Sequence, residues 1–121
     1  MYQVNRSIVI LKPKEPFLNW VLQSDGFKQL QITLEDLRSD CTVLLLPNFN
    51  DQENALQYVY SQFKNIFEME LEAWFVDETL WPSNRTLKMF KEWIDVEFHS
   101  TVIDLVEDEF ETSDLANSSL H

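Results

Sequence analysis

Three residues of metal-binding type alternate in one segment near the end of the chain. Asp95, Glu97 and His99 are each separated by a single residue. In an extended strand, alternate side chains lie on one face in steps of ~6.5–7 Å, so these three would point the same way. Carboxylates and imidazoles are ligands in several divalent-metal sites. The spacing therefore predicts, as one alternative, a small metal-binding protein or enzyme. The other interpretation is a half-exposed strand, which alternates in the same way, or a helix that still includes Asp95.

The single cysteine, Cys41, and His99 are the residue types of a nucleophile and its base. A reactive thiol needs an electropositive setting that lowers its pKa, whereas the chain has a net charge of −12. The opposing interpretation is that Cys41 is a small buried hydrophobic side chain. One cysteine also excludes an intramolecular disulfide, a CxxC redox pair and a cysteine-based zinc site.

A tryptophan beside a proline precedes a small basic cluster. Trp81 and Pro82 are followed by Arg85, Lys88 and Lys91 at intervals of three residues, which predicts a loose basic stripe on one helix. Trp and Arg are enriched at the energetic centres of interfaces, so this patch is a candidate interaction surface. A helix N-terminus here could also hold a small anion. The alternative is internal, with Trp81 in the core and the cations paired with acidic residues. The acidic candidates are Glu68, Glu70, Glu72 and Glu92.

Acidic residues outnumber basic ones by 21 to 9, and the excess lies in residues 41–121. The segment with Glu68, Glu70 and Glu72, and the pair Asp77-Glu78, predict either a solvated surface or one that binds a basic partner or mimics nucleic acid. A strongly negative chain repels the phosphates of nucleic acids and anionic membranes. We therefore expect the partner to be another protein, with a basic surface as one option, and neither nucleic acid nor a membrane.

The chain has one glycine, Gly26, which follows Asp25 and predicts a turn that ends the first helix. The phosphate-binding loops GxGxxG and GxxxxGK[ST] and the nucleophile elbow GxSxG need several glycines and are excluded. The N-terminal residues carry no basic and apolar leader. The longest apolar run is far shorter than the ~20 residues of a membrane span. These features predict a cytoplasmic protein without a cofactor, apart from the divalent metal considered above.

Hydrophobic periodicity predicts the elements that position these residues. Strands are expected at residues 6–12, 41–46 and 96–105. The first two are apolar on both faces, which is typical of strands covered on both sides, and the first reads as a central strand. Helices are expected at residues 16–24, 33–39, 51–75 and 84–94.

Local signals support several of these helices. Pro16 suits a first helical turn, and Thr33 followed three residues later by Asp36 is a capping box. Apolar residues recur at spacings of three and four along residues 51–75, and only Glu70 breaks this stripe. The pattern predicts either one long helix or two helices that break near Asn65.

The expected element order is β-αα-β-α-α-β. This order predicts an α+β or small α/β fold, in which helices cover a three-stranded sheet. Residues 1–105 are expected to form one globular domain. Residues 106–121 hold five acids and no lysine or arginine, so they are expected to form an acidic disordered tail.

Two groups of residues resemble a set of small, acidic bacterial proteins of unknown activity. One runs through Trp81-Pro82-Ser83-Asn84-Arg85-Thr86 with Met89-Phe90 and Trp93 beyond it; the other comprises residues 5–9, Lys12-Pro13, Pro16-Phe17, Trp20 and Leu34-Glu35. The resemblance spans about residues 4–105. It implies a bacterial cytosolic protein and brings no activity, cofactor or site residue to this chain.

These observations predict a non-enzymatic, cytosolic protein-interaction or regulatory protein. The negative charge, the small size and the missing catalytic motifs favour it. One alternative is a metal-binding protein or enzyme that uses Asp95, Glu97 and His99. Another is an immunity protein or a mimic of nucleic acid.

Overall fold

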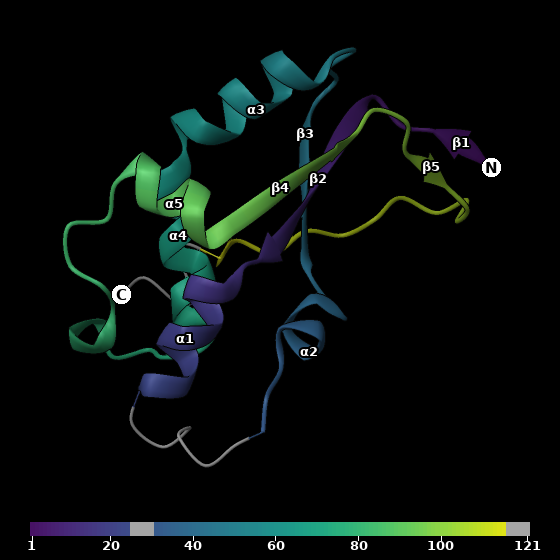
Figure 1. Cartoon of the computed structure of the whole chain (residues 1–121). Helices are drawn as coiled ribbons and strands as arrows, with labels where there is room; N and C mark the ends of the chain where they lie inside the picture. The colour runs from purple at the N-terminus through teal and green to yellow at the C-terminus, as the bar shows by residue number, and fades with distance from the viewer. Residues whose placement is uncertain (25–30, 116–121) are drawn as a thin grey trace.

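The sheet at the centre of the fold has three antiparallel strands. The structure is a computed structural model that describes residues 1–24 and 31–115 (Figure 1). Strand β2 (Arg6–Pro13) lies between β3 (Thr42–Pro47) and β4 (Ile94–His99). Strands β1 (Tyr2–Gln3) and β5 (Ile103–Asp104) pair in a separate antiparallel ribbon. The α+β class and the central place of the first predicted strand are both confirmed.

In Figure 1 the helices lie to the left of the sheet, except for one short helix below it. They are α1 (Glu15–Gln23), α2 (Leu34–Arg38), α3 (Gln52–Ser61), α4 (Phe63–Glu72) and α5 (Leu87–Trp93), with a 3₁₀ turn η1 at Glu78–Leu80. Each of α1 to α5 contributes buried side chains to one cluster. The sheet contributes Val9, Leu11, Leu46, Ile94 and Val96 to the same cluster.

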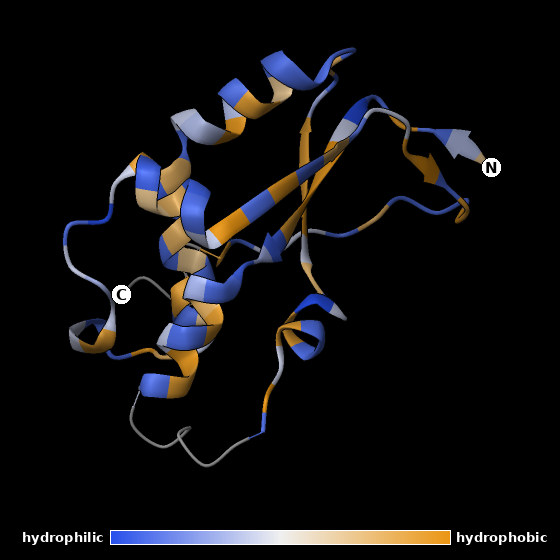
Figure 2. Cartoon of the chain, viewed as in Figure 1, coloured by the Kyte–Doolittle hydropathy of each residue, from blue (hydrophilic) through white to orange (hydrophobic). Residues whose placement is uncertain are grey.

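The opposite face of the sheet is not buried as the sequence predicted. It carries Ile8 and Ile10 from β2, which are half-buried, and Val43 and Leu45 from β3, which are each 52% exposed. Hydrophobic residues run along β2 and β3, while the helices alternate between polar and apolar residues (Figure 2). Two-sided coverage is therefore wrong for β3, because all of α1 to α5 pack into the single core cluster on the Val9 side.

The short helices begin where the sequence predicts. Thr33 Oγ1 accepts from the backbone N–H of Asp36 at 3.1 Å, and Asp36 Oδ2 accepts from the backbone N–H of Thr33 at 2.9 Å. This reciprocal pair is the predicted capping box. In α1, Pro16 occupies the first turn, as expected.

The single long helix is wrong, and the alternative of two helices is confirmed. Asp51 caps α3 by accepting from the backbone N–H of Asn54 at 3.1 Å. The chain leaves helical geometry at Gln62, three residues before the predicted break at Asn65. Helix α3 contacts β4, whereas α4 contacts α5. A straight helix of ~36 Å could not follow both neighbours. The observed element order therefore has two helices, α3 and α4, where the predicted order has one.

The predicted boundary between the last helix and the last strand is also shifted. Thr86 caps α5 by accepting from Met89 N–H at 3.2 Å, and the helix ends at Trp93. Ile94 is already extended and pairs with Pro13. Asp95 therefore belongs to the strand rather than the helix. The predicted strand at 96–105 divides into β4 and β5, because β5 pairs with β1 instead of β2.

Residues 105–114 form no helix or strand, and every one of them is exposed. The division into a domain and a disordered tail at residue 105 stays a prediction. Gly26, where a turn is predicted, and residues 116–121 of the predicted tail lie outside the described residues. No helix in the two described ranges is long and apolar enough to cross a membrane.

Candidate functional site

Trp81 lies inside the protein. It follows η1, is 8% exposed, and its indole Nε1 donates to the carbonyl oxygen of Phe75 at 2.7 Å. A buried tryptophan normally finds such a partner for its N–H. This placement corresponds to the internal alternative, because little of the ring is available to a partner.

Arg85 joins Trp81 and Glu68 into one internal contact. Its Nη2 lies 3.0 Å from Glu68 Oε2, and its Nη1 donates to the carbonyl oxygen of Pro82 at 3.0 Å. The guanidinium carbon lies 5.5 Å from the centroid of the Trp81 ring, within the range of a cation–π contact. The preceding Asn84 has φ 54°, a left-handed conformation that asparagine tolerates. The guanidinium is therefore held by residues of its own chain.

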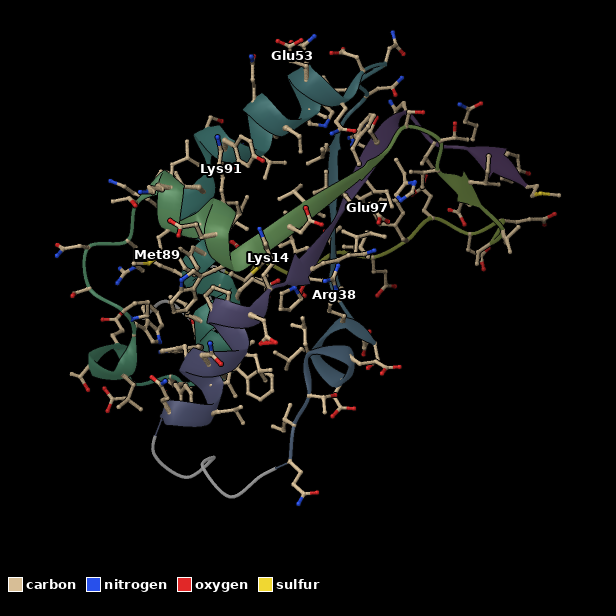
Figure 3. The ribbon with its side chains drawn as sticks, viewed as in Figure 1. Lys14, Arg38, Glu53, Met89, Lys91 and Glu97 are labelled. Carbon is tan, nitrogen blue, oxygen red and sulfur yellow. The ribbon has the colours of Figure 1, made fainter. Side chains whose placement is uncertain are left out.

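The predicted basic stripe is not a single helical face. Arg85 precedes the cap of α5, so only Lys88 and Lys91 lie on that helix, and both are exposed. Lys91 is labelled in Figure 3, and its Nζ lies 4.5 Å from the Tyr60 ring centroid. The Lys91 carbonyl oxygen accepts from Lys14 Nζ at 3.2 Å. The stripe is wrong for Arg85 because the chain does not become helical until Leu87.

The acidic residues of α4 have different surroundings. Glu68 pairs with Arg85, and the half-buried Glu70 accepts from Thr42 Oγ1 at 3.2 Å. Glu72 is half-buried on the same helix, four residues from Glu68. The binding surface predicted for these carboxylates therefore stays a prediction.

The alternating residues of β4 do share one face, as their spacing predicts. Asp95, Glu97 and His99 pair in register with Lys12, Ile10 and Ile8 on the open side of the sheet. Glu97 Oε1 lies 2.6 Å from Lys12 Nζ, and Glu97 Oε2 lies 2.7 Å from His99 Nε2. The Lys12 ammonium is thus paired with Glu97, the central residue of the three. Within residues 1–24 and 31–115, no three His, Cys, Asp or Glu side chains are grouped closely enough to hold a metal.

The contacts with Lys12 and His99 lower the pKa of Glu97 from its ordinary 4.5 to about 2. A lowered pKa means that the ionised carboxylate stabilises the fold above pH 4.5, and this contribution is lost as the pH falls through about 2. We predict that Lys12→Met raises the pKa of Glu97, measured by carboxyl ¹³C NMR titration. Lys14→Met, which changes a lysine bonded elsewhere, should leave it unchanged. A wild-type midpoint near 4.5 would contradict the ion pair.

Cys41 and His99 lie at opposite ends of the sheet. Cys41 directly precedes Thr42, which pairs with Leu11, whereas His99 pairs with Ile8 at the other end of β2. Burial raises the pKa of the Cys41 thiol, which disfavours the thiolate. The two residues therefore do not form a nucleophile and base.

A cavity of about 270 Å³ opens beside Cys41 at the end of the sheet, which we term the end cavity. Its polar lining is Asp40, Cys41, Thr42 and Glu70. Burial raises the pKa of Glu70, and the hydrogen bond from Thr42 opposes this shift. One indication of this site is visible in the sequence, since Glu70 interrupts an apolar helical stripe that faces the core. The cavity itself depends on contacts between distant segments.

A second cavity of about 290 Å³ lies on the open face of the sheet, and we term it the open-face groove. Leu45 lines it from β3, together with Val102 and Ile103 from the β4–β5 segment and Phe110 from the C-terminal segment. Arg6 and Asp104 are its charged residues. The sequence pattern missed this surface because apolar residues on both faces of a strand normally indicate burial on both faces.

The chain matches no protein-family model, no curated protein and no solved structure. The function is therefore argued from the geometry of these surfaces.

Proposed function

We propose that this protein is a non-enzymatic interaction module that binds an extended, basic segment of a partner protein at the open-face groove. The observation that carries the proposal is the exposure of Val43 and Leu45, each 52%, in the middle of an ordered strand. Neighbouring side chains, Ile103 and Phe110, are also exposed. Exposed apolar patches of this kind mark sites of association.

The backbone of β3 supports an extended partner. One edge of β3 pairs with β2, and no strand in the described part of the chain pairs with its other edge. The segment Thr42–Pro47 contains no charged residue, whereas β4 at the other edge of the sheet carries Asp95, Glu97 and His99. Charged residues protect an edge strand from pairing, and an apolar edge invites it. A partner strand is thus expected beside β3.

The charge around the groove favours a basic partner. Asp104 lines the groove, and the segment after it carries Glu107, Asp108 and Glu109, all exposed. Arg6 is the one cation in the groove lining. With a net charge of −12, a second copy of the chain would be repelled. A partner segment with a lysine or arginine next to an apolar side chain fits this groove. Its apolar side chain would contact the apolar lining, and its positive charge would lie near the acidic residues.

The test is site-specific photo-crosslinking in cells that naturally make the protein. A photo-reactive benzoylphenylalanine replaces Leu45, and the matched control replaces Val76, which is 77% exposed and lines neither cavity described above. We expect an adduct from position 45 alone, whose crosslinked peptide carries an apolar residue beside Lys or Arg. Adducts from both positions, no adduct from position 45, or an adduct with a second copy of this chain would each contradict the proposal.

The crosslinked peptide then gives a quantitative prediction. Leu45→Lys should weaken binding of the synthetic peptide at least about tenfold, because it replaces an apolar wall with a charge that repels the partner. Val76→Lys should leave the affinity unchanged. Both substitutions are at exposed positions, so the free energy of unfolding should change by less than ~0.5 kcal/mol. Isothermal titration calorimetry and urea unfolding measure the two quantities, and equal affinities for both variants would overturn the assignment.

A further inference from the structure

We infer that the end cavity is a binding site for a small apolar amine, with Glu70 receiving the ammonium group. The cavity is formed where β2, β3 and β4 meet α1, α2 and α4, at the far end of the sheet from His99. It shares no lining residue with the open-face groove, so the inference stands independently of the proposed function.

Most of the side chains that line the end cavity are apolar. Leu11, Phe17 and Ile94 line it, and each is at most 3% exposed because the core holds its remaining surface. Leu37 and Pro13 extend the same wall. Preformed apolar walls with a few polar groups are typical of small-molecule sites. An apolar ligand body would therefore contact chiefly the half-buried lining residues Pro13, Cys41 and Trp74, above a floor that the core already holds in place.

The polar end of the cavity has one unused acceptor. Glu70 Oε2 accepts from Thr42 Oγ1 at 3.2 Å, whereas its Oε1 has no hydrogen-bond partner in the described ranges. Asp40 lies at the same end and is exposed. Because no buried side-chain oxygen in the described residues lacks a partner, Oε1 is reached by water, and a ligand ammonium would replace that water.

The charge at this end favours an amine over other ligand types. An ammonium group has three donors and a positive charge, so it complements both Glu70 and Asp40. A carboxylate ligand would be repelled by the same residues, and a neutral alcohol would form only an uncharged hydrogen bond. The positive charges of Lys12 and Arg38 act to lower the pKa of the neighbouring Cys41. Neither of them lines the cavity.

The cavity volume sets the size of the ligand. A volume of about 270 Å³ corresponds to about nine water-sized groups at ~30 Å³ each. 2-Phenylethylamine has about this size, and phenylacetate provides the same ring with the opposite charge. The two compounds therefore separate binding driven by the apolar wall from binding that uses the Glu70 carboxylate.

The experiment is a ¹H–¹⁵N NMR titration of the full chain at ~150 mM salt, which screens weak charge effects. We expect saturable shifts at Thr42, Glu70 and Ala73 with 2-phenylethylamine and a Kd of ~0.1–1 mM. Phenylacetate should bind at least about tenfold more weakly. Equal binding of the two probes would overturn the inference. So would amine-induced shifts spread along the acidic C-terminal residues, because they would indicate nonspecific charge.

Two variants test the role of Glu70 and of the cavity separately. Glu70→Gln keeps the side-chain shape and should weaken amine binding at least about tenfold, whereas Glu72→Gln on the same helix should not. Ala73→Leu places a larger side chain in the lining and should abolish binding of the amine. The dispersed NMR spectrum confirms folding in each case. Unchanged amine affinity in either Glu70→Gln or Ala73→Leu would contradict the site.

Discussion

Trp81→Ala is expected to lower the free energy of unfolding by ~3–5 kcal/mol, the usual cost of removing a large aromatic side chain from a core. The ring is 8% exposed, and its Nε1 donates to the carbonyl oxygen of Phe75 at 2.7 Å. Removing it leaves a cavity and also deprives Arg85 of its cation–π contact. The loss arises from the fold itself and does not require a partner.

Urea unfolding followed by circular dichroism measures this effect. Trp81→Phe should cost less than Trp81→Ala, because it keeps part of the ring volume, although it removes the N–H donor and the rest of the indole. Val76→Ala is the matched control in the preceding loop, and at 77% exposure it should change stability by less than ~0.5 kcal/mol. An alanine variant with wild-type stability but impaired binding of a partner would instead place Trp81 in an interface.

The features of the fold that could be predicted depend on residues close together in the sequence. Thr33 and Asp36 are three residues apart, and both hydrogen bonds of their capping box form within that distance. Pro16 at the start of α1 is a similar case. The apolar run of β2 identified a central strand because neighbouring strands bury both of its edges.

The features that could not be predicted depend on distant contacts. Gln62 is an ordinary helix former, yet the chain breaks there because α3 packs against β4 and α4 against α5. No turn residue separates α5 from β4. Instead, the backbone N–H of Lys14 donates to the carbonyl oxygen of Trp93 at 2.8 Å. The end of α5 is therefore held by a residue that is far away in the sequence.

In the candidate sites too, features set by neighbouring residues could be predicted and features set by distant contacts could not. Strand alternation placed Asp95, Glu97 and His99 on one face, but their cation is Lys12, 85 residues from Glu97. Glu70 could be recognised as an anomaly in its helix, yet its Thr42 contact could not. The open face of β3 was hidden by its composition. An apolar strand face indicates burial, and only the placement of α1 to α5 in one core cluster shows that these helices leave this face uncovered.

Phe90→Ala is expected to cost ~3–5 kcal/mol as well, because Phe90 is fully buried and links helices α3, α4 and α5. Its ring lies 5.7 Å from that of Phe67 and 6.3 Å from that of Tyr60, both in edge-to-face arrangements. A double-mutant cycle with Phe67→Ala should give a coupling of ~0.5–1.5 kcal/mol, the range for such aromatic pairs. Independent effects of the two substitutions would show that the rings do not interact.

Phe110→Ala is the matched control for Phe90→Ala, because it removes the same side chain from a position that is 65% exposed. Its free energy of unfolding should stay within ~0.5 kcal/mol of the wild type. Since Phe110 lines the open-face groove, the same variant should bind the crosslinked partner peptide more weakly. The two phenylalanines therefore separate the requirements of the fold from those of binding. A loss of stability in Phe110→Ala comparable to that in Phe90→Ala would mean that the C-terminal segment is part of the core and that the groove is not a free surface.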